Sequence, residues 1–231
     1  MPVSELLNVC IKCFDHTTRK ILLGLNTAVV YGSARQSRQG IKVAHFIVRK
    51  LEERDHAVTL VDSRECELPF LDLMYKEYEV GQAPEAMETV AETFRSADGF
   101  IIVSAEYNHS IPAALKNLLD YYQSEYLYKP SAIVTYSAGP FGGVRALINL
   151  RAILAELGTP SIPSAFPVSH VGNSFDDDGN PLDEAYDERI IKFLDEYEWY
   201  ANALRRARDQ EKIGDEPPAQ QQMCRGTESA A

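Results

Sequence analysis

One short loop holds residues whose types and spacing suit the binding of a phosphate. The loop runs from Gly32 to Gly40, follows an apolar run and precedes a helical pattern that opens near Ile41. Unpaired backbone N–H groups and the positive end of a helix dipole both attract an anion at such a helix start. Serine hydroxyls and one guanidinium would complete this phosphate cradle: Ser33, Ser37 and Arg35.

The same residues also suit a plain strand-to-helix turn. Gly-Ser after a strand is ordinary turn chemistry, and a serine near a helix start is often only its N-cap. The loop also lacks the Gly-x-Gly-x-x-Gly spacing of dinucleotide-binding folds and the Gly-Lys-Ser/Thr ending of nucleotide triphosphatases. A monophosphate of the FMN type remains compatible with the residues present.

A second polar loop, Glu106–Pro112, follows the continuous apolar run Gly99–Ala105. Its Asn108 and Ser110 side chains could bind a planar heterocycle, while Tyr107 lies against the face or edge of the ring. An ordinary loop with Ser110 as the N-cap of the next helix is the alternative. Two side chains of this loop are also candidate proton donors to a product, Tyr107 and His109.

A third loop, Ser137–Gly143, follows the apolar run 132–136 and contains three glycines, Gly139, Gly142 and Gly143. Glycines let the backbone approach a ligand closely and leave several N–H donors free to face it. Each of the three polar loops therefore comes after an expected strand and before an expected helix.

The elements that must position these loops can be read from the apolar periodicity. Strands are expected at 27–31, 57–61, 99–105 and 132–136, with an edge strand at 161–168 because it carries two prolines. Helical patterns begin near residues 41, 84 and 112, another has its apolar positions at 147–157, and a last one covers 183–208. This alternation predicts a doubly wound, five-stranded parallel α/β sheet with helices on both faces, in the flavodoxin-like order 2-1-3-4-5. The loops after strands 1, 3 and 4 would then converge on one crevice.

The chain is expected to form a single domain at 27–210. Residues 1–26 look like an appendage with a short amphipathic pattern, and the Pro-, Gln- and Ser-rich residues 211–231 are expected to be a disordered tail. The segment Tyr121–Tyr128 crowds four tyrosines into eight residues, which favours a subunit contact over the edge of the core.

Charge and composition exclude several classes of partner. With 23 Lys and Arg against 34 Asp and Glu, the formal net charge is -11, so neither nucleic acid nor an anionic membrane surface is an expected partner. No apolar run approaches the ~20 residues needed to span a bilayer, and the N-terminus lacks the pattern of a secretory signal.

No metal site is expected. Cys10 and Cys13 have no further ligands at zinc spacing, and the Asp176–Gly179 run lacks the alternating ligands and distal glutamate of a calcium loop. The cysteines are expected to be free thiols in a reducing cytoplasm.

Taken together in order, the motifs resemble the NADPH-dependent FMN reductase family. They are Gly-Ser-Ala-Arg-Gln-Ser, Glu-Tyr-Asn-His-Ser-Ile-Pro followed by Leu-Lys-Asn-Leu-Leu-Asp, Lys-Pro before the fourth strand, and Ser-Ala-Gly-x-x-Gly-Gly. The resemblance covers roughly 27–166. It departs from the family at Ala105, where proline is usual, so the approach of the second loop to the ring is expected to differ slightly.

The resemblance implies a role for each loop. Its phosphate loop would hold the FMN phosphate, the second loop would border the isoalloxazine with N–H groups near N5 and O4, and the glycine loop would face N1 and O2. The positions implied for the phosphate are Ser33, Arg35, Ser37, Gln39 and Gly40. Those implied for the ring are Glu106, Tyr107, Asn108, Ser137, Gly139, Gly142 and Gly143.

The family resemblance further implies a flavin oxidoreductase. NADPH or NADH would pass hydride to the flavin, which would then reduce a quinone or another small-molecule acceptor, in a homodimer or homotetramer. Three alternatives remain open: a reductase that releases reduced FMN to a monooxygenase, a flavodoxin-type electron carrier, and a module that binds another phosphorylated ligand.

Overall fold

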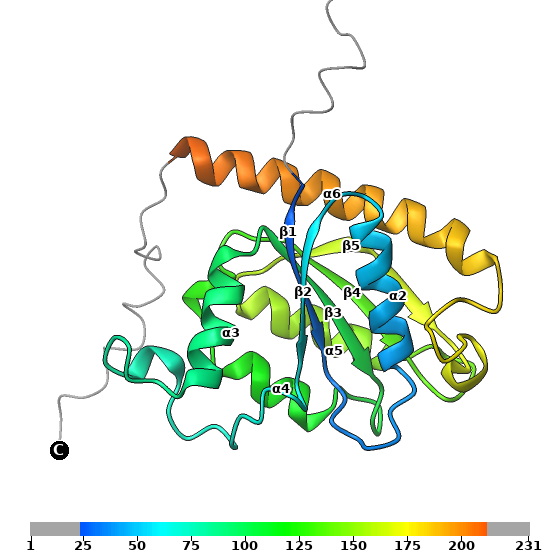
Figure 1. Ribbon diagram of the computed structural model, residues 1–231, viewed down its shortest axis with the longest axis horizontal. Coiled ribbons are helices and arrows are strands. Elements are labelled where there is room, and N and C mark those ends of the chain that lie inside the picture. Colours follow the sequence, from blue (N-terminus) through cyan, green and yellow to red (C-terminus); the bar gives the residue numbers. More distant parts are fainter. Residues whose placement is uncertain (1–23, 212–231) are drawn as a thin grey trace, which may run out of the picture.

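The apolar runs of the sequence form a parallel sheet in the computed structural model, which describes residues 24–211 (Figure 1). The strand order is β2-β1-β3-β4-β5, so the predicted order is confirmed. The strands are β1 (Asn26–Tyr31), β2 (Ala57–Asp62), β3 (Gly99–Ala105), β4 (Ser131–Tyr136) and β5 (Ser161–Val168).

Five α-helices connect or follow these strands in the described part of the chain. They are α2 (Ile41–Glu52), α3 (Glu85–Ser96), α4 (Ala113–Asp120), α5 (Val144–Glu156) and α6 (Ala185–Glu211). Short 3-10 turns occur at η2 (Tyr75–Glu77), η3 (Ser124–Tyr126) and η4 (Val171–Asn173). The expected N-terminal appendage and C-terminal tail lie almost wholly outside the described residues, although Leu25 is buried and Asn26 already belongs to β1.

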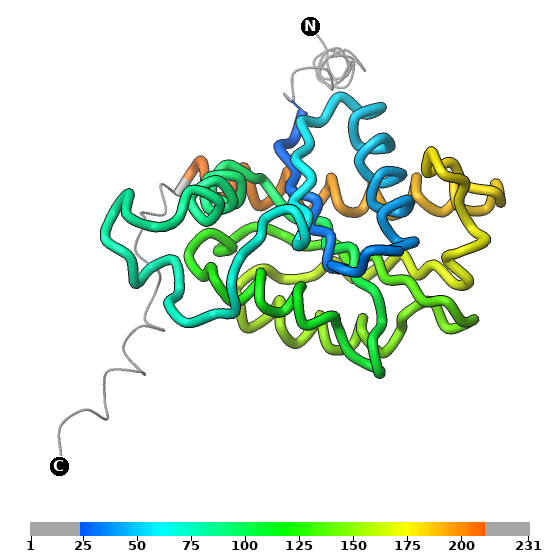
Figure 2. The backbone as a smooth tube through the Cα atoms, turned by 60° about the horizontal axis from the view of Figure 1, so that its bottom comes forward, coloured from blue at the N-terminus to red at the C-terminus, as the bar shows by residue number. Residues whose placement is uncertain are grey.

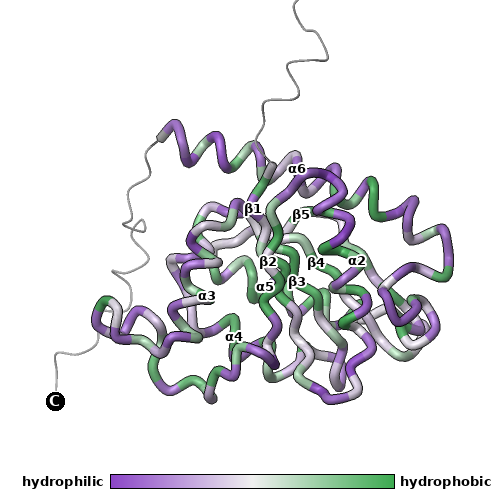
Figure 3. Tube along the Cα trace, in the orientation of Figure 1, coloured by the Kyte–Doolittle hydropathy of each residue, from purple (hydrophilic) through white to green (hydrophobic). Residues whose placement is uncertain are grey.

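The two faces of the sheet are covered by different helices. Alternate residues of β1 point to opposite faces, because side chains alternate along a strand. Val29 and Tyr31 pack with α2 and α6, whereas Ala28 and Val30 pack with α3, α4 and α5. All residues of β3 and β4 are buried, as expected for central strands covered on both sides. Figure 3 shows hydrophobic residues concentrated in the central strands and hydrophilic ones along much of α6.

The tyrosine-rich segment belongs to the core, so the expected subunit contact was wrong for three of its four tyrosines. Tyr121, Tyr122 and Tyr126 are at most 2% exposed. The Tyr122 hydroxyl donates to the Met87 carbonyl at 3.0 Å. A tyrosine-rich run does not reveal whether its rings meet another subunit or, as here, the core of the same chain.

Between residues 24 and 211, no helix combines the length and the apolar character needed to cross a membrane.

Candidate active site at the ends of β1, β3 and β4

The three polar loops meet at one edge of the sheet, because parallel strands end on the same side. The Ser33 hydroxyl and the Tyr107 hydroxyl lie 2.7 Å apart, which joins the first loop to the second. The Glu106 N–H donates to the Tyr136 carbonyl at 3.1 Å, which joins the second loop to the end of β4. The predicted convergence of the loops is confirmed.

The phosphate loop presents most of its predicted polar side chains to solvent. Arg35, Ser37 and Gln39 are exposed, and within residues 24–211 the Arg35 guanidinium makes no hydrogen bond or ion pair. Helix α2 starts after Gly40 without a side-chain cap. The Lys42 and Val43 N–H groups donate to the Gln39 and Gly40 carbonyls, so within residues 24–211 the Ile41 N–H is the one left free at the positive end of the helix dipole. The loop therefore offers free hydrogen-bond donors to an anion.

Ser33 is placed differently from the other cradle residues. Its side chain is almost fully buried and engaged with Tyr107. A serine hydroxyl can accept one hydrogen bond and donate another. If Tyr107 donates to Ser33, the Ser33 proton is free for a phosphate oxygen. The two hydroxyls then form a short hydrogen-bond chain that ends on the phosphate.

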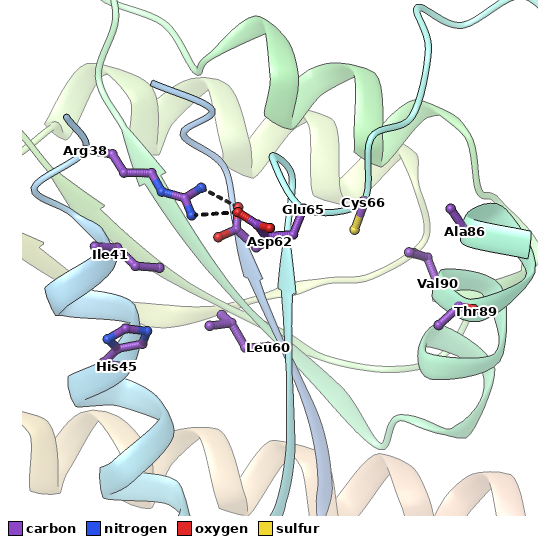
Figure 4. Close-up of a pocket in the computed structure, with 10 residues that line it drawn as sticks. All are labelled: Arg38, Ile41, His45, Leu60, Asp62, Glu65, Cys66, Ala86, Thr89 and Val90. Carbon is purple, nitrogen blue, oxygen red and sulfur yellow. Dashed lines mark hydrogen bonds and ion pairs between the residues drawn. The ribbon is translucent and has the colours of Figure 1, made fainter. Parts of the chain in front are cut away.

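Arg38 fixes the shape of the phosphate loop, a role that the sequence did not indicate. Its guanidinium donates to the Ser33 carbonyl at 3.1 Å and pairs with Asp62 at 2.6 Å, as Figure 4 shows for the ion pair. It also lies 5.3 Å from the centre of the Tyr31 ring. Asp62 ends the neighbouring strand β2, so this partner becomes visible only once β1 and β2 pair.

The hollow beside this ion pair contains the thiol of Cys66 (Figure 4). Burial raises the pKa of Cys66 to about 11, and the charges of Asp62 and Glu65 raise it in the same direction. The thiol is therefore protonated at neutral pH and is not a nucleophile there. Cys66 is unpaired, as expected, while the other three cysteines lie outside the described residues.

Gly40 lets α2 begin in direct contact with the Tyr136 ring at the end of β4. A Cβ atom at this position would lie 2.0 Å from the Tyr136 ring, whose hydroxyl is 3.0 Å from that of Tyr31. Because the Tyr31 and Tyr136 rings are both buried, the Tyr136 ring cannot move aside easily.

We expect Gly40→Ala to push the start of α2 away from the site. Overpacking of this kind costs about 1–3 kcal/mol, and the misplaced N–H groups would also weaken anion binding. Denaturant unfolding and flavin titration check the two effects. An Ala variant with unchanged stability and unchanged flavin affinity would contradict the role of Gly40. Gly172→Ala is the control, because Gly172, like Gly40, has no positive φ and its added methyl would meet nothing within 4 Å.

The second loop is a tight turn with two residues in left-handed conformation. Asn108 and His109 have φ angles of 48° and 66°, and Tyr107 and Ser110 exchange backbone hydrogen bonds across the turn. The N–H groups of Glu106 and Tyr107 are thus already used within the protein. Within residues 24–211, the N–H groups of Asn108 and the neighbouring His109 make no hydrogen bond. Ser110 does not cap α4, whose N-cap is Pro112.

The Glu106 side chain caps α5 and is therefore not a free carboxylate. It accepts hydrogen bonds from the Arg145 N–H at 3.0 Å and from the Arg145 guanidinium at 3.1 Å. Partial burial by itself would raise the pKa of Glu106, but these hydrogen bonds outweigh it and hold the pKa below its usual range. Arg145 was missed in the sequence because its partner is 39 residues away.

The glycines of the third loop have different reasons to be glycine. Gly142 and Gly143 have φ angles of 60° and 80° and pack tightly against β5 and β4, so the fold itself requires them. Gly139 has no such φ, and a Cβ there would meet nothing within 4 Å. Its small size therefore leaves room for a molecule that lies against the loop.

Comparisons with known proteins agree with this arrangement. Residues 25–173 match the model of a family described as NADPH-dependent FMN reductase. A 2-hydroxy-1,4-benzoquinone reductase from a Burkholderia species is 31% identical over 182 residues, which cover 76% of this chain and 95% of the relative. A quinone reductase from Pseudomonas putida is 32% identical over 167 residues, which cover 69% of this chain and 86% of that protein.

The fold is shared with solved flavoenzymes. FerB, an NAD(P)H:(acceptor) oxidoreductase from Paracoccus denitrificans, superimposes with a TM-score of 0.61 at 23% sequence identity, covering 78% of this chain and 97% of FerB. The resemblance found in the sequence motifs is thereby confirmed, and the chain belongs to the NADPH-dependent FMN reductase family.

Proposed function

We propose that this chain is an NAD(P)H-dependent oxidoreductase that holds FMN across the three loops and reduces a quinone or a similar small acceptor. The observation that carries the proposal is the unpaired Arg35 guanidinium beside an uncapped helix start, at the rim where the loops after β1, β3 and β4 meet. Curated relatives bear the names quinone reductase and NADPH azoreductase, which supports the same class of reaction.

The residues present fit a flavin mononucleotide. A phosphate dianion needs several donors, and Arg35, Ser37 and the Ile41 N–H supply them without breaking a hydrogen bond seen among residues 24–211. A flat ring needs open space beside backbone donors. The loop at Gly139 and the turn at Asn108 and His109 provide both.

The protein's part in the reaction is orientation and electrostatics. When bound, FMN supplies the hydride-accepting and electron-passing chemistry. The free N–H groups of Asn108 and His109 would stabilise negative charge at the ring edge, and the Arg38–Asp62 pair would keep Ser33 and its loop in register. Tyr107 or His109 would supply a proton to the product.

The proposal includes a cytoplasmic homodimer or homotetramer. Phe141, Val144 and Ile148 are exposed, and the last two lie four residues apart on one face of α5. An apolar stripe beside the site supports a second copy as its cover. Light scattering of the protein and of Ile148→Asp checks this, with a smaller particle expected for the variant.

An absorbance spectrum before and after anaerobic addition of NADPH tests the proposed function. We expect flavin bands that bleach on addition and return when a quinone is added. A colourless protein that also fails to bind added FMN would contradict the proposal. FMN that leaves the protein on gel filtration would instead support a reductase that supplies free reduced flavin.

A further inference from the structure

A second hollow adjoins the phosphate loop on its other side. It has a volume of about 430 Å³ and lies between Ala34 of that loop, the segment after β2 and the start of α4. In Figure 2 the loop after β1, in blue, and the segment after β2, in cyan, lie side by side at this edge. None of the residues expected to bind the flavin lines this hollow.

The wall of the hollow is held in place by α4. The Asn117 amide accepts a hydrogen bond from the Leu71 N–H at 2.9 Å and donates to the Pro69 carbonyl at 2.7 Å. The Tyr121 hydroxyl donates to the same carbonyl at 2.9 Å. Because the segment is fixed at two nearby positions, the hollow is preformed, as small-molecule sites usually are.

An unpaired cation marks the hollow. Across residues 24–211, the side chains of Arg35, Arg64 and Lys192 are the only Lys or Arg side chains without a hydrogen bond or ion pair. Arg64 lines the hollow, and Arg35 is the next residue after its lining residue Ala34. Because Arg35 is assigned to the FMN phosphate, Arg64 is the free guanidinium left for the hollow, and in a chain of net charge -11 it favours an anionic ligand there.

The rest of the lining suits a flat apolar group. Leu68, Pro69 and Leu118 contribute carbon surface, and the Phe70 ring is 85% exposed at the hollow. An aromatic ring left in water beside a cavity offers a stacking surface for a planar base. A ligand of about this size that combines an anionic group with a planar base is a nucleoside phosphate.

We infer that this hollow binds the adenosine 2′-phosphate end of NADPH, with the 2′-phosphate on Arg64 and the adenine against Phe70. The inference rests on the proposed function, because it names the part of the protein that selects the hydride donor. The hollow adjoins the flavin phosphate loop at Ala34, so the dinucleotide would run from the hollow past the bound FMN phosphate to bring its nicotinamide to the flavin ring.

Two other polar groups, Ser63 and Glu67, line the hollow. The Ser63 hydroxyl is buried and, in the described part of the chain, is the one buried side-chain polar atom without a partner. The Glu67 carboxylate also lines the hollow and is exposed, so it opposes a phosphate there. Glu67→Gln is therefore expected to strengthen binding of the same ligand that Arg64→Ala weakens.

Titration of the full-length, flavin-loaded protein with 2′,5′-ADP tests the inference directly. We expect Arg64→Ala to weaken 2′,5′-ADP binding about tenfold or more, since a charge-assisted contact is lost. The same variant should raise the KM for NADPH by a similar factor and leave the KM for NADH and the retention of FMN unchanged. Phe70→Ala should raise both KM values, because the adenine is common to both donors.

Lys192→Ala is the matched control, because it removes an unpaired cation on α6 and should change none of these constants. Equal effects of Arg64→Ala on NADPH and NADH, or unchanged 2′,5′-ADP affinity, would overturn the inference. Loss of FMN from Arg64→Ala would overturn it too, because Arg64 would then serve the flavin phosphate. A wild-type protein that neither binds FMN nor oxidises a nicotinamide nucleotide would instead be a failure of the proposed function.

Discussion

Replacing Arg35 by Ala should weaken FMN binding by about 1.5–3 kcal/mol, which is roughly a 10- to 150-fold higher Kd. The reason is that Arg35 is the guanidinium of the phosphate loop with no partner among residues 24–211, whereas Arg38 is committed to Asp62 and the Ser33 carbonyl. Quenching of flavin fluorescence during titration of the apoprotein measures the Kd. Folding stability should be nearly unchanged.

Two variants separate this effect from a general change of charge. Lys192→Ala removes an unpaired cation far along the chain, on α6, and should leave the Kd for FMN unaltered. Arg38→Ala should weaken FMN binding and also lower stability, because it breaks the ion pair between the loop after β1 and the end of β2. If Arg35→Ala holds FMN as tightly as the wild type, Arg35 is not part of the cradle.

Replacing Glu106 by Gln should lower the free energy of unfolding by about 1.5–3 kcal/mol at pH 7. The carboxylate caps the first turn of α5 and pairs with Arg145, and its side chain is only 10% exposed. The glutamine amide is uncharged, so the hydrogen bonds from the Arg145 N–H and guanidinium would lose their charge-assisted part. Denaturant unfolding at constant ionic strength measures the loss.

The stability effect of Glu106 should depend on pH in a defined direction. Because the pKa of Glu106 is lowered in the folded protein, its contribution is fully present above the ordinary glutamate pKa of about 4.3 and disappears as pH falls through the lowered value. The stability difference between wild type and Glu106→Gln should therefore shrink on acidification below about pH 4.5. A difference that stays constant down to pH 3 would show that the charge does not matter.

Glu92→Gln provides the matched control for this experiment. Glu92 also pairs with an arginine, Arg95, but both side chains are well exposed on α3. Exposed pairs of this kind contribute about 0–1 kcal/mol, so the control should be close to wild type. A loss equal to that of Glu106→Gln would attribute the effect to net charge instead of the helix cap.

The sequence determined the order of the elements and the position of the polar loops. Local patterns are enough for this, because period-two and period-3.6 repeats report the face that each residue buries. The predicted strand Gly99–Ala105 agrees with β3 at both ends, and the two prolines of 161–168 marked an edge strand that the sheet indeed has. The three loop motifs also identified the family before any contact was known.

Only the tertiary structure decided what each polar group is bonded to. The resemblance implied that Glu106 borders the flavin ring, but it did not indicate that the Glu106 carboxylate caps α5. Arg38 had no predicted role, and it fastens the phosphate loop to β2. The four tyrosines after α4 were expected at an interface, and three of them are buried in the chain's own core. The physical reason is the same in each case: the partner is brought close by strand pairing or helix packing, and no local spacing carries that information.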